Sequence, residues 1–220
     1  MTQKTEPLIL FLSKTTDWCK AAQLFMLKHF RNVTVFEGER DSKFPESAKN
    51  WQGDYVISFL SAWVIPQAVL SSAKKAAINF HPAPPEYPGI GCYNFALYDE
   101  AKEYGVTCHH MAAKVDSGSI VKVMRFPLFP TDSVESLKDR SMVYLLTLFY
   151  EMGGLIAQGQ KLPASPEVWQ HQPYTRKELN ALCRITPDMP EDEMRRRIRA
   201  TFYPGYPGPY VELAGCKFSI

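Results

Sequence analysis

Three polar side chains, Asn79, His81 and Asp116, have types and spacings suited to chemistry on an acyl group. An apolar run that ends at Ile78 leads into Asn79 and His81, and a stretch rich in proline and glycine follows. This pattern predicts a buried strand that runs out into a rigid loop. Because side chains alternate along a strand, Asn79 and His81 share one face at its carboxyl end, where open α/β sheets bind ligands. Asp116 stands at a glycine turn between two further strand-like segments.

These groups supply what acyl transfer to an amine requires. The amide N–H of Asn79 can stabilise the oxyanion of a tetrahedral intermediate, His81 can accept the proton of the attacking amine, and Asp116 can orient the imidazole. Taken singly, each residue has an ordinary structural explanation: the Asn as a cap, the His as a satisfied core or surface residue, the Asp as a turn former. Their order and spacing together favour a catalytic site.

The motifs around these residues resemble those of the formyltransferases that use N10-formyltetrahydrofolate. The motifs are Asn-x-His-Pro, Tyr-x-Gly, Gly-Val-Thr-x-His-x-Met and Asp-Ser-Gly-x-Ile. The matching positions are Asn79, His81, Pro82, Tyr87, Gly89, Gly105, Val106, Thr107, His109, Met111, Asp116, Gly118 and Ile120. The resemblance implies an α/β fold with a Rossmann-like core, in which a mostly parallel twisted sheet is flanked by helices. It also implies catalytic roles for Asn79, His81 and Asp116.

The resemblance further implies N10-formyltetrahydrofolate as the formyl donor. The unusually apolar segment 59–65 is similar to the family's pterin pocket. The expected folate contacts are therefore Phe59, Leu60, Trp63 and Ile65, together with Val115 and Asp116. The alternative for Trp63 and Ile65 is simple packing under the short helix expected over residues 66–70.

Three more residues are candidates for binding the acceptor substrate: Tyr87, Asn94 and His109. Asn94 lies near the start of a helix expected over residues 92–103, where its side chain faces either substrate or water. His109 and His110 invite a metal hypothesis, but adjacent strand residues point to opposite faces and no third ligand lies nearby in the sequence. No metal is expected.

The rest of the chain predicts a scaffold for this site. Continuous or β-branched apolar runs at 8–12, 33–36 and 54–60 indicate strands, and a helix capped by Thr16 or Asp17 separates the first two. This strand–helix–strand order implies a right-handed crossover. A long apolar band from 133 to about 158 indicates a core helix.

The length of 220 residues suits one catalytic domain, placed at 1–165, with a C-terminal extension at 166–220 that carries a small helix, expected over residues 191–200, and a β-hairpin. The net charge of +2 creates no strong field for polyanions, so no nucleic-acid partner is expected. The five cysteines are odd in number and lack metal spacing, which is typical of a reducing compartment. No targeting signal or bilayer-spanning run is recognised at the N-terminus, and the expected location is the cytoplasm.

The acceptor is inferred from the extension and by exclusion. An aromatic, proline-rich loop and a hairpin turning at Ala214-Gly215 resemble the closing element of sugar and lipid-sugar formyltransferases. The aromatic rings of the loop are expected to stack on a nucleotide base, and the alternatives are a homodimer contact or a cover for the sheet edge. The loop 13–17 lacks the glycines of the purine-pathway enzyme, which acts on phosphoribosylglycinamide. The stretch after residue 165 is shorter than the tRNA-binding domain of methionyl-tRNA formyltransferases, and the regulatory domain of the related hydrolases is not recognised.

The sequence therefore favours transfer of a formyl group to a nucleotide-linked amino deoxysugar, as used in surface polysaccharide. The alternatives are a phosphoribosylglycinamide or methionyl-tRNA formyltransferase activity and a non-catalytic folate-binding module. The intact Asn79, His81 and Asp116 argue against the last of these, because a binding module needs no general base.

Overall fold

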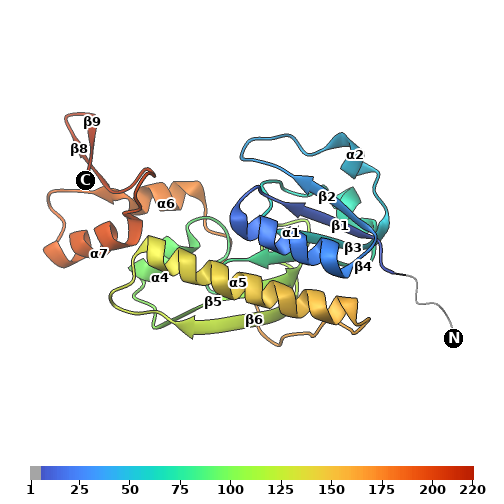
Figure 1. Cartoon of the computed structure of the whole chain (residues 1–220). Coiled ribbons are helices and arrows are strands. Elements are labelled where there is room, and N and C mark those ends of the chain that lie inside the picture. Colours follow the sequence, from blue (N-terminus) through green and yellow to red (C-terminus); the bar gives the residue numbers. More distant parts are fainter. Residues whose placement is uncertain (1–5) are drawn as a thin grey trace.

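A six-stranded sheet forms the centre of the computed structural model, which describes residues 6–220 (Figure 1). The strands follow the order β2-β1-β3-β4-β5-β6. They are β1 (Ile9–Ser13), β2 (Val33–Glu37), β3 (Gly53–Phe59), β4 (Ala73–His81), β5 (Glu103–His110) and β6 (Ile120–Pro127). β1 to β4 pair in parallel, and β5 and β6 join them antiparallel. The mostly parallel α/β sheet that the sequence predicts is thereby confirmed.

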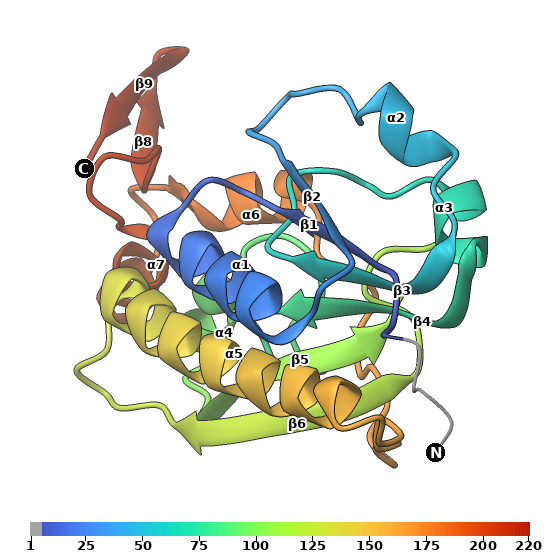
Figure 2. The same ribbon diagram turned by 45° about the vertical axis from the view of Figure 1, so that its right-hand side comes forward.

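Helices cover both faces of this sheet. The helices α1 (Asp17–His29) and α5 (Val134–Ala157) lie side by side across one face (Figures 1 and 2). Two short helices, α2 (Glu46–Lys49) and α3 (Gln67–Ser71), accompany a smaller apolar cluster on the other face. The helix α4 (Cys92–Tyr98) follows the loop after β4. The start of α5 agrees with the sequence, because Ser133 and Ser136 form a capping box there.

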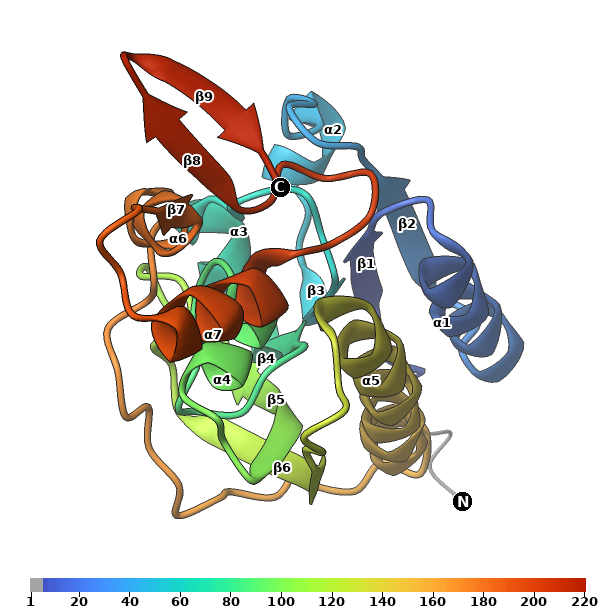
Figure 3. The same ribbon diagram turned by 90° about the vertical axis from the view of Figure 1, so that its left-hand side faces the viewer.

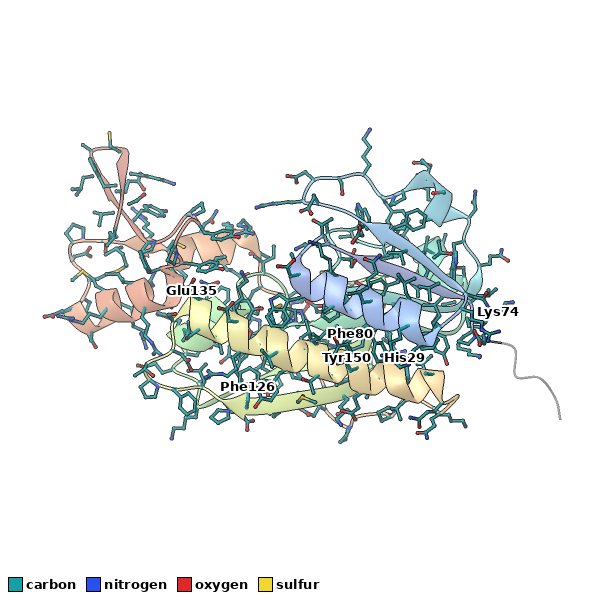
Figure 4. All side chains as sticks on the ribbon, viewed as in Figure 1. His29, Lys74, Phe80, Phe126, Glu135 and Tyr150 are labelled. Atoms are coloured by element: carbon teal, nitrogen blue, oxygen red, sulfur yellow. The ribbon has the colours of Figure 1, made fainter. Side chains whose placement is uncertain are left out.

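The aromatic core under α5 fixes the orientation of β4. Phe149 of α5 packs edge-on against Phe59 and Phe80, with ring centroids 5.0 Å apart in each pair. Phe80 is 1 % exposed and lies between the sheet and the helix (Figure 4). Because strand side chains alternate, this anchoring turns Asn79 and His81 toward the opposite face.

The helix expected over residues 92–103 is shorter than predicted. It ends at Tyr98, and β5 already begins at Glu103. The cause is a Schellman motif: Glu100 adopts a left-handed conformation with φ of 53°, and the Ala101 N–H donates to the Ala96 carbonyl at 3.1 Å. The polar residues that follow the motif therefore enter a strand instead of extending the helix.

The C-terminal elements gather at the end of the sheet away from the start of β1 (Figure 1). They comprise α6 (Arg176–Leu182), β7 (Arg184–Ile185), α7 (Glu191–Thr201), β8 (Tyr210–Leu213) and β9 (Cys216–Ser219). α7 packs across α4, and the β8–β9 hairpin projects beyond it (Figure 3). The predicted turn is confirmed, since Ala214 and Gly215 both have positive φ, as a two-residue hairpin turn requires. The sequence did not predict α6 or β7.

A segment without helix or strand, residues 163–174, connects the core to these elements, and we call it the strap. Its backbone is tied to the core at both ends and in the middle. The hydrogen bonds run from Ser165 N–H to the Ile120 carbonyl, from Gln170 N–H to the Pro85 carbonyl and from Tyr174 N–H to the Pro88 carbonyl, at 2.9 to 3.0 Å. The domain boundary proposed near residue 165 falls within the strap, whose remainder stays packed against the core.

Across residues 6–220, none of the helices combines the length and apolar composition needed to cross a bilayer. The expectation about an N-terminal signal falls partly on residues 1–5, which lie outside the described residues.

Candidate active site

The end of β4 presents Asn79 and His81 to a cavity. In the antiparallel register, Asn79 lies opposite His109 of β5, and His81 lies opposite Thr107. Asn79, His81 and His109 all line the cavity, and the ring of Phe80 packs against Phe149 in the core. Local alternation and cross-strand pairing thus bring a carboxamide and two imidazoles to one wall.

Asp116 reaches the same wall from the turn between β5 and β6. Its backbone is left-handed, with φ of 46°, and its Oδ2 accepts a 2.9 Å hydrogen bond from the Gly89 N–H. Oδ2 lies 3.4 Å from Nδ1 of His81, and Oδ1 lies 3.4 Å from Nε2 of His109. Burial by itself raises the pKa of Asp116, but His81, His109 and the Gly89 N–H outweigh it and lower the pKa to about 2. Asp116 is therefore an anion between the two imidazoles at neutral pH.

The tautomer of His109 follows from its contacts. Nδ1 of His109 lies 2.9 Å from the His110 carbonyl, an acceptor, so Nδ1 carries the proton. Nε2 of the neutral ring is then an acceptor, and the Asn79 amide Nδ2 lies 3.1 Å from it. Asn79 consequently donates one N–H to His109, which fixes the orientation of its carboxamide and leaves its second N–H available for a ligand.

The His81 imidazole is 6 % exposed, and both of its nitrogens have neighbours. Nε2 lies 3.1 Å from the Tyr87 carbonyl and donates to it, so in the neutral ring Nδ1 is the basic atom, facing Asp116. Burial lowers the pKa of His81, and the attraction to Asp116 opposes this only in part. The ring is thus neutral at pH 7 and can accept a proton at Nδ1, where the Asp116 carboxylate stabilises the resulting imidazolium.

The cavity beside these groups has a volume of about 370 Å³, within the range of small-molecule sites. Leu60, Trp63 and Ile65, from the apolar segment after β3, form one wall, and Val115 stands near Asp116. The indole N–H of Trp63 donates to the Ser42 carbonyl at 3.0 Å, which holds the ring in place. Leu60 has a φ of 54°, a left-handed conformation that a non-glycine residue adopts at a cost of about 1 to 2 kcal/mol. Such a wall suits a flat heterocycle.

Three of the residues expected in the site lie elsewhere. Phe59 is fully buried among Phe80 and Phe149, on the face of the sheet away from the cavity. Tyr87 contributes its carbonyl to His81, but its ring stacks on Tyr104. Asn94 does not line the cavity, and its Nδ2 donates to the Ala200 carbonyl at 2.7 Å and so ties α4 to α7.

Other residues at the site were missed from the sequence. Lys14, Ser58, Met111 and Lys114 line the cavity, and Trp169 of the strap contacts both imidazoles from outside it. Met111 ends the Gly-Val-Thr-x-His-x-Met motif, but no motif marks the other four positions. A tryptophan within a proline-rich connection was the only available signal for Trp169. Within residues 6–220, no group of three or more His, Cys, Asp or Glu side chains is arranged to hold a metal ion.

The chain belongs to the formyl transferase family, because the family's sequence profile matches residues 9–144, more than half of the chain. The family expected from the Asn79, His81 and Asp116 motifs is thereby confirmed. The protein is accordingly an enzyme of the class that transfers formyl groups.

Individual relatives of this chain are also named as formyltransferases. GDP-perosamine N-formyltransferase of Brucella melitensis is 28 % identical over 199 residues, which cover 90 % of this chain and 76 % of that protein. Methionyl-tRNA formyltransferase of Latilactobacillus sakei is 28 % identical over 193 residues, covering 86 % of this chain but 59 % of that protein. The fold matches the crystal structure of an N-formyltransferase from Helicobacter canadensis in complex with folinic acid and dTDP-3-aminofucose. The TM-score is 0.75 and the identity 18 %, and the match covers 96 % of this chain and 86 % of that chain.

Proposed function

We propose that this protein transfers the formyl group of N10-formyltetrahydrofolate to the primary amine of a nucleotide-linked amino deoxysugar. The observation that carries the proposal is the cluster of Asn79, His81, His109 and Asp116, which faces a cavity with an apolar wall. The perosamine relative and the complex of the Helicobacter canadensis enzyme with folinic acid and dTDP-3-aminofucose support the donor and the acceptor class.

In this proposal the 370 Å³ cavity receives the formyl-bearing end of the folate. Leu60, Trp63, Ile65 and Val115 supply the apolar contacts to the pterin. These contacts explain why the segment between β3 and α3 is apolar although it forms a loop.

The catalytic roles follow from the available atoms. The free N–H of Asn79 stabilises the oxyanion that develops when the amine nitrogen bonds to the formyl carbon. Nδ1 of His81 takes the proton of the attacking amine, and Asp116 stabilises the imidazolium. His81 then returns that proton to the departing nitrogen as the bond from the formyl carbon to N10 breaks. The products are tetrahydrofolate and the N-formyl sugar, so neither a covalent enzyme intermediate nor a metal is required.

The same proposal includes a homodimer. Val211 and Phe218 are cross-strand partners on one face of the β8–β9 hairpin, as are Leu213 and Cys216. Leu213 and Phe218 are 52 % and 55 % exposed, and β9 is an edge strand. An exposed apolar face beside an unpaired edge suits a second copy of the chain.

We place the enzyme in the cytoplasm, because all five cysteines are free thiols.

Release of tetrahydrofolate from N10-formyltetrahydrofolate tests the proposal. The acceptors compared are GDP-, dTDP- and UDP-linked amino sugars, glycinamide ribonucleotide and methionyl-tRNA. We expect turnover with an amino sugar, reduced about 10²- to 10³-fold in Asn79→Ala because an oxyanion donor is lost. Asn180→Ala, at an exposed position in α6, is the matched control and keeps full activity.

Each other outcome has a definite meaning. Turnover with glycinamide ribonucleotide or methionyl-tRNA alone contradicts the acceptor class but retains the chemistry. A folate complex that releases no tetrahydrofolate with any amine contradicts the enzymatic proposal and favours a binding module.

A further inference from the structure

Trp169 is the strap residue that touches the catalytic imidazoles. Its ring meets His109 edge-on, with centroids 5.0 Å apart and planes at 88°, and it meets His81 at 5.9 Å and 68°. Its indole N–H donates to the Gly118 carbonyl at 2.8 Å, in the turn that carries Asp116. One side chain therefore contacts both histidines and the turn of the carboxylate.

The strap holds Trp169 by an ion pair on one side of it and a hydrogen bond on the other. Glu167 pairs with Arg125 of β6, and Arg125 also pairs with Glu86 at 3.0 Å, in the loop after β4. Gln170 donates to the same Glu86 carboxylate at 3.1 Å. Residues on either side of Trp169 are thus linked through one partly buried charge cluster, which keeps the indole against the histidines.

Two cavities meet at this point. The cavity that contains Asn79, His81 and His109 shares Lys114 and Asp116 with a second cavity of about 750 Å³ under the strap. Trp169 lines only the second cavity. The indole therefore separates the two imidazoles from that space, and His109 is only 2 % exposed.

We propose that Trp169 is a positioning residue for formyl transfer, which holds the imidazoles of His81 and His109 toward Asp116 and shields them from the second cavity. This inference rests on the proposed function of His81 as the base. An aromatic edge contact favours one ring orientation without competing for the imidazole nitrogens, which remain free for Asn79 and Asp116.

Loss of the indole opens a route for water from the second cavity to His81. The groups that face His81 are Asp116, His109 and the Tyr87 carbonyl, with Lys14 and Lys114 on the cavity wall. Hydration removes part of the burial that lowers the pKa of His81, while the Asp116 carboxylate remains in place. The pKa of His81 consequently rises in a variant without the indole.

The primary experiment is an NMR titration of the histidine side chains in the absence of any substrate, on the full chain. We expect the pKa of His81 to rise by about one unit in Trp169→Ala and to change little in Trp169→Phe, which keeps an aromatic ring. Val168→Ala is the matched control, because Val168 is the neighbouring strap residue and is 71 % exposed. An unchanged His81 titration in Trp169→Ala overturns the proposal. If Trp169→Ala does not fold, Trp169→Leu takes its place, with the same expected rise.

Kinetics supply the second readout. We expect Trp169→Ala to lose at least about tenfold in kcat through misorientation of the base, with the KM for the folate within about twofold of the wild-type value. A fall in folate affinity with unchanged kcat contradicts a positioning role. Failure of every amino sugar with the wild-type protein contradicts the proposed function alone, since the titration requires no turnover.

Discussion

At the scale of single residues, the contacts of His109 determine how Asn79 is presented. The Nδ1 proton of His109 is bound by a backbone carbonyl, so Nε2 accepts from the Asn79 amide. An Asn side chain free to rotate would offer its oxygen as readily as its N–H groups. The oxyanion donor is therefore oriented before a ligand arrives, which is the condition for efficient electrostatic stabilisation.

The pH dependence of the reaction follows from His81. Because burial lowers its pKa below the ordinary value of 6.5, the ring stays neutral and active at pH 6.5, and kcat/KM falls only at lower pH. Asp116→Asn removes the attraction that raises this pKa, so the inflection moves to still lower pH while the maximal rate falls. The measurement is kcat/KM between about pH 5 and pH 8, the range of histidine titration. An inflection above 6.5 in the wild-type enzyme, or an upward shift in Asp116→Asn, is incompatible with this assignment.

At the scale of elements, α5 carries two adjacent glycines with opposite surroundings. A Cβ on Gly153 would lie 2.6 Å from the Phe25 ring of α1, and a Cβ on Gly154 would meet nothing within 4 Å. Phe25 packs against Phe149, Tyr150 and His29, the last two labelled in Figure 4. Gly153 thus allows α1 and α5 to approach closely, whereas Gly154 serves no packing purpose.

Substitution of these glycines by alanine has effects of opposite sign. Gly154→Ala raises the free energy of unfolding by about 0.5 to 1 kcal/mol, because alanine loses less backbone entropy in a helix. Gly153→Ala lowers it by about 1 to 3 kcal/mol through overpacking against Phe25. Urea denaturation of the two variants measures both changes. If the free energy of unfolding changes equally in Gly153→Ala and Gly154→Ala, the contact between α1 and α5 is looser than described.

At the scale of the whole molecule, the C-terminal elements differ in how they meet the core: α7 is packed against it, and the β8–β9 hairpin is not. α7 is joined to the core through α4, since Asn94 bonds to Ala200 and Tyr98 donates to Glu193 at 2.9 Å. The β8–β9 hairpin instead projects from the molecule with its apolar face uncovered (Figure 3). The first arrangement closes the fold of one chain, and the second leaves a surface for association.

Phe218→Glu tests the proposed homodimer. We expect the wild-type protein to have twice the 25.0 kDa mass of one chain by light scattering. Phe218→Glu places a charge in the apolar face and yields the monomer, without a change in thermal unfolding of the core. Ser219→Glu, the next residue on the opposite face of β9, is the matched control and stays dimeric. A monomeric wild-type protein removes the dimer from the proposal and leaves the formyl transfer intact.

Much of the architecture follows from short-range pattern alone. The apolar runs of β1 and β3, the shared face of Asn79 and His81 and the Ala214-Gly215 turn all depend on alternation or turn chemistry within a few residues. The helix after Cys92 was predicted too long, since the polar residues after Tyr98 give no apolar spacing that marks its end. A left-handed Glu100 decided that boundary.

The sequence by itself determined the family, the mostly parallel sheet and the face that carries the chemistry. Only the tertiary structure decided that Asn94 ties α4 to α7, that Phe59 faces the core and that Trp169 covers two histidines. The physical reason is the separation along the sequence over which each signal acts. Periodicity depends on neighbouring residues and shows only which face of its own element a residue occupies. Contacts such as those between Trp169 and His81 depend instead on the path of the strap, which is held by hydrogen bonds and by the Arg125 charge cluster between segments distant in sequence.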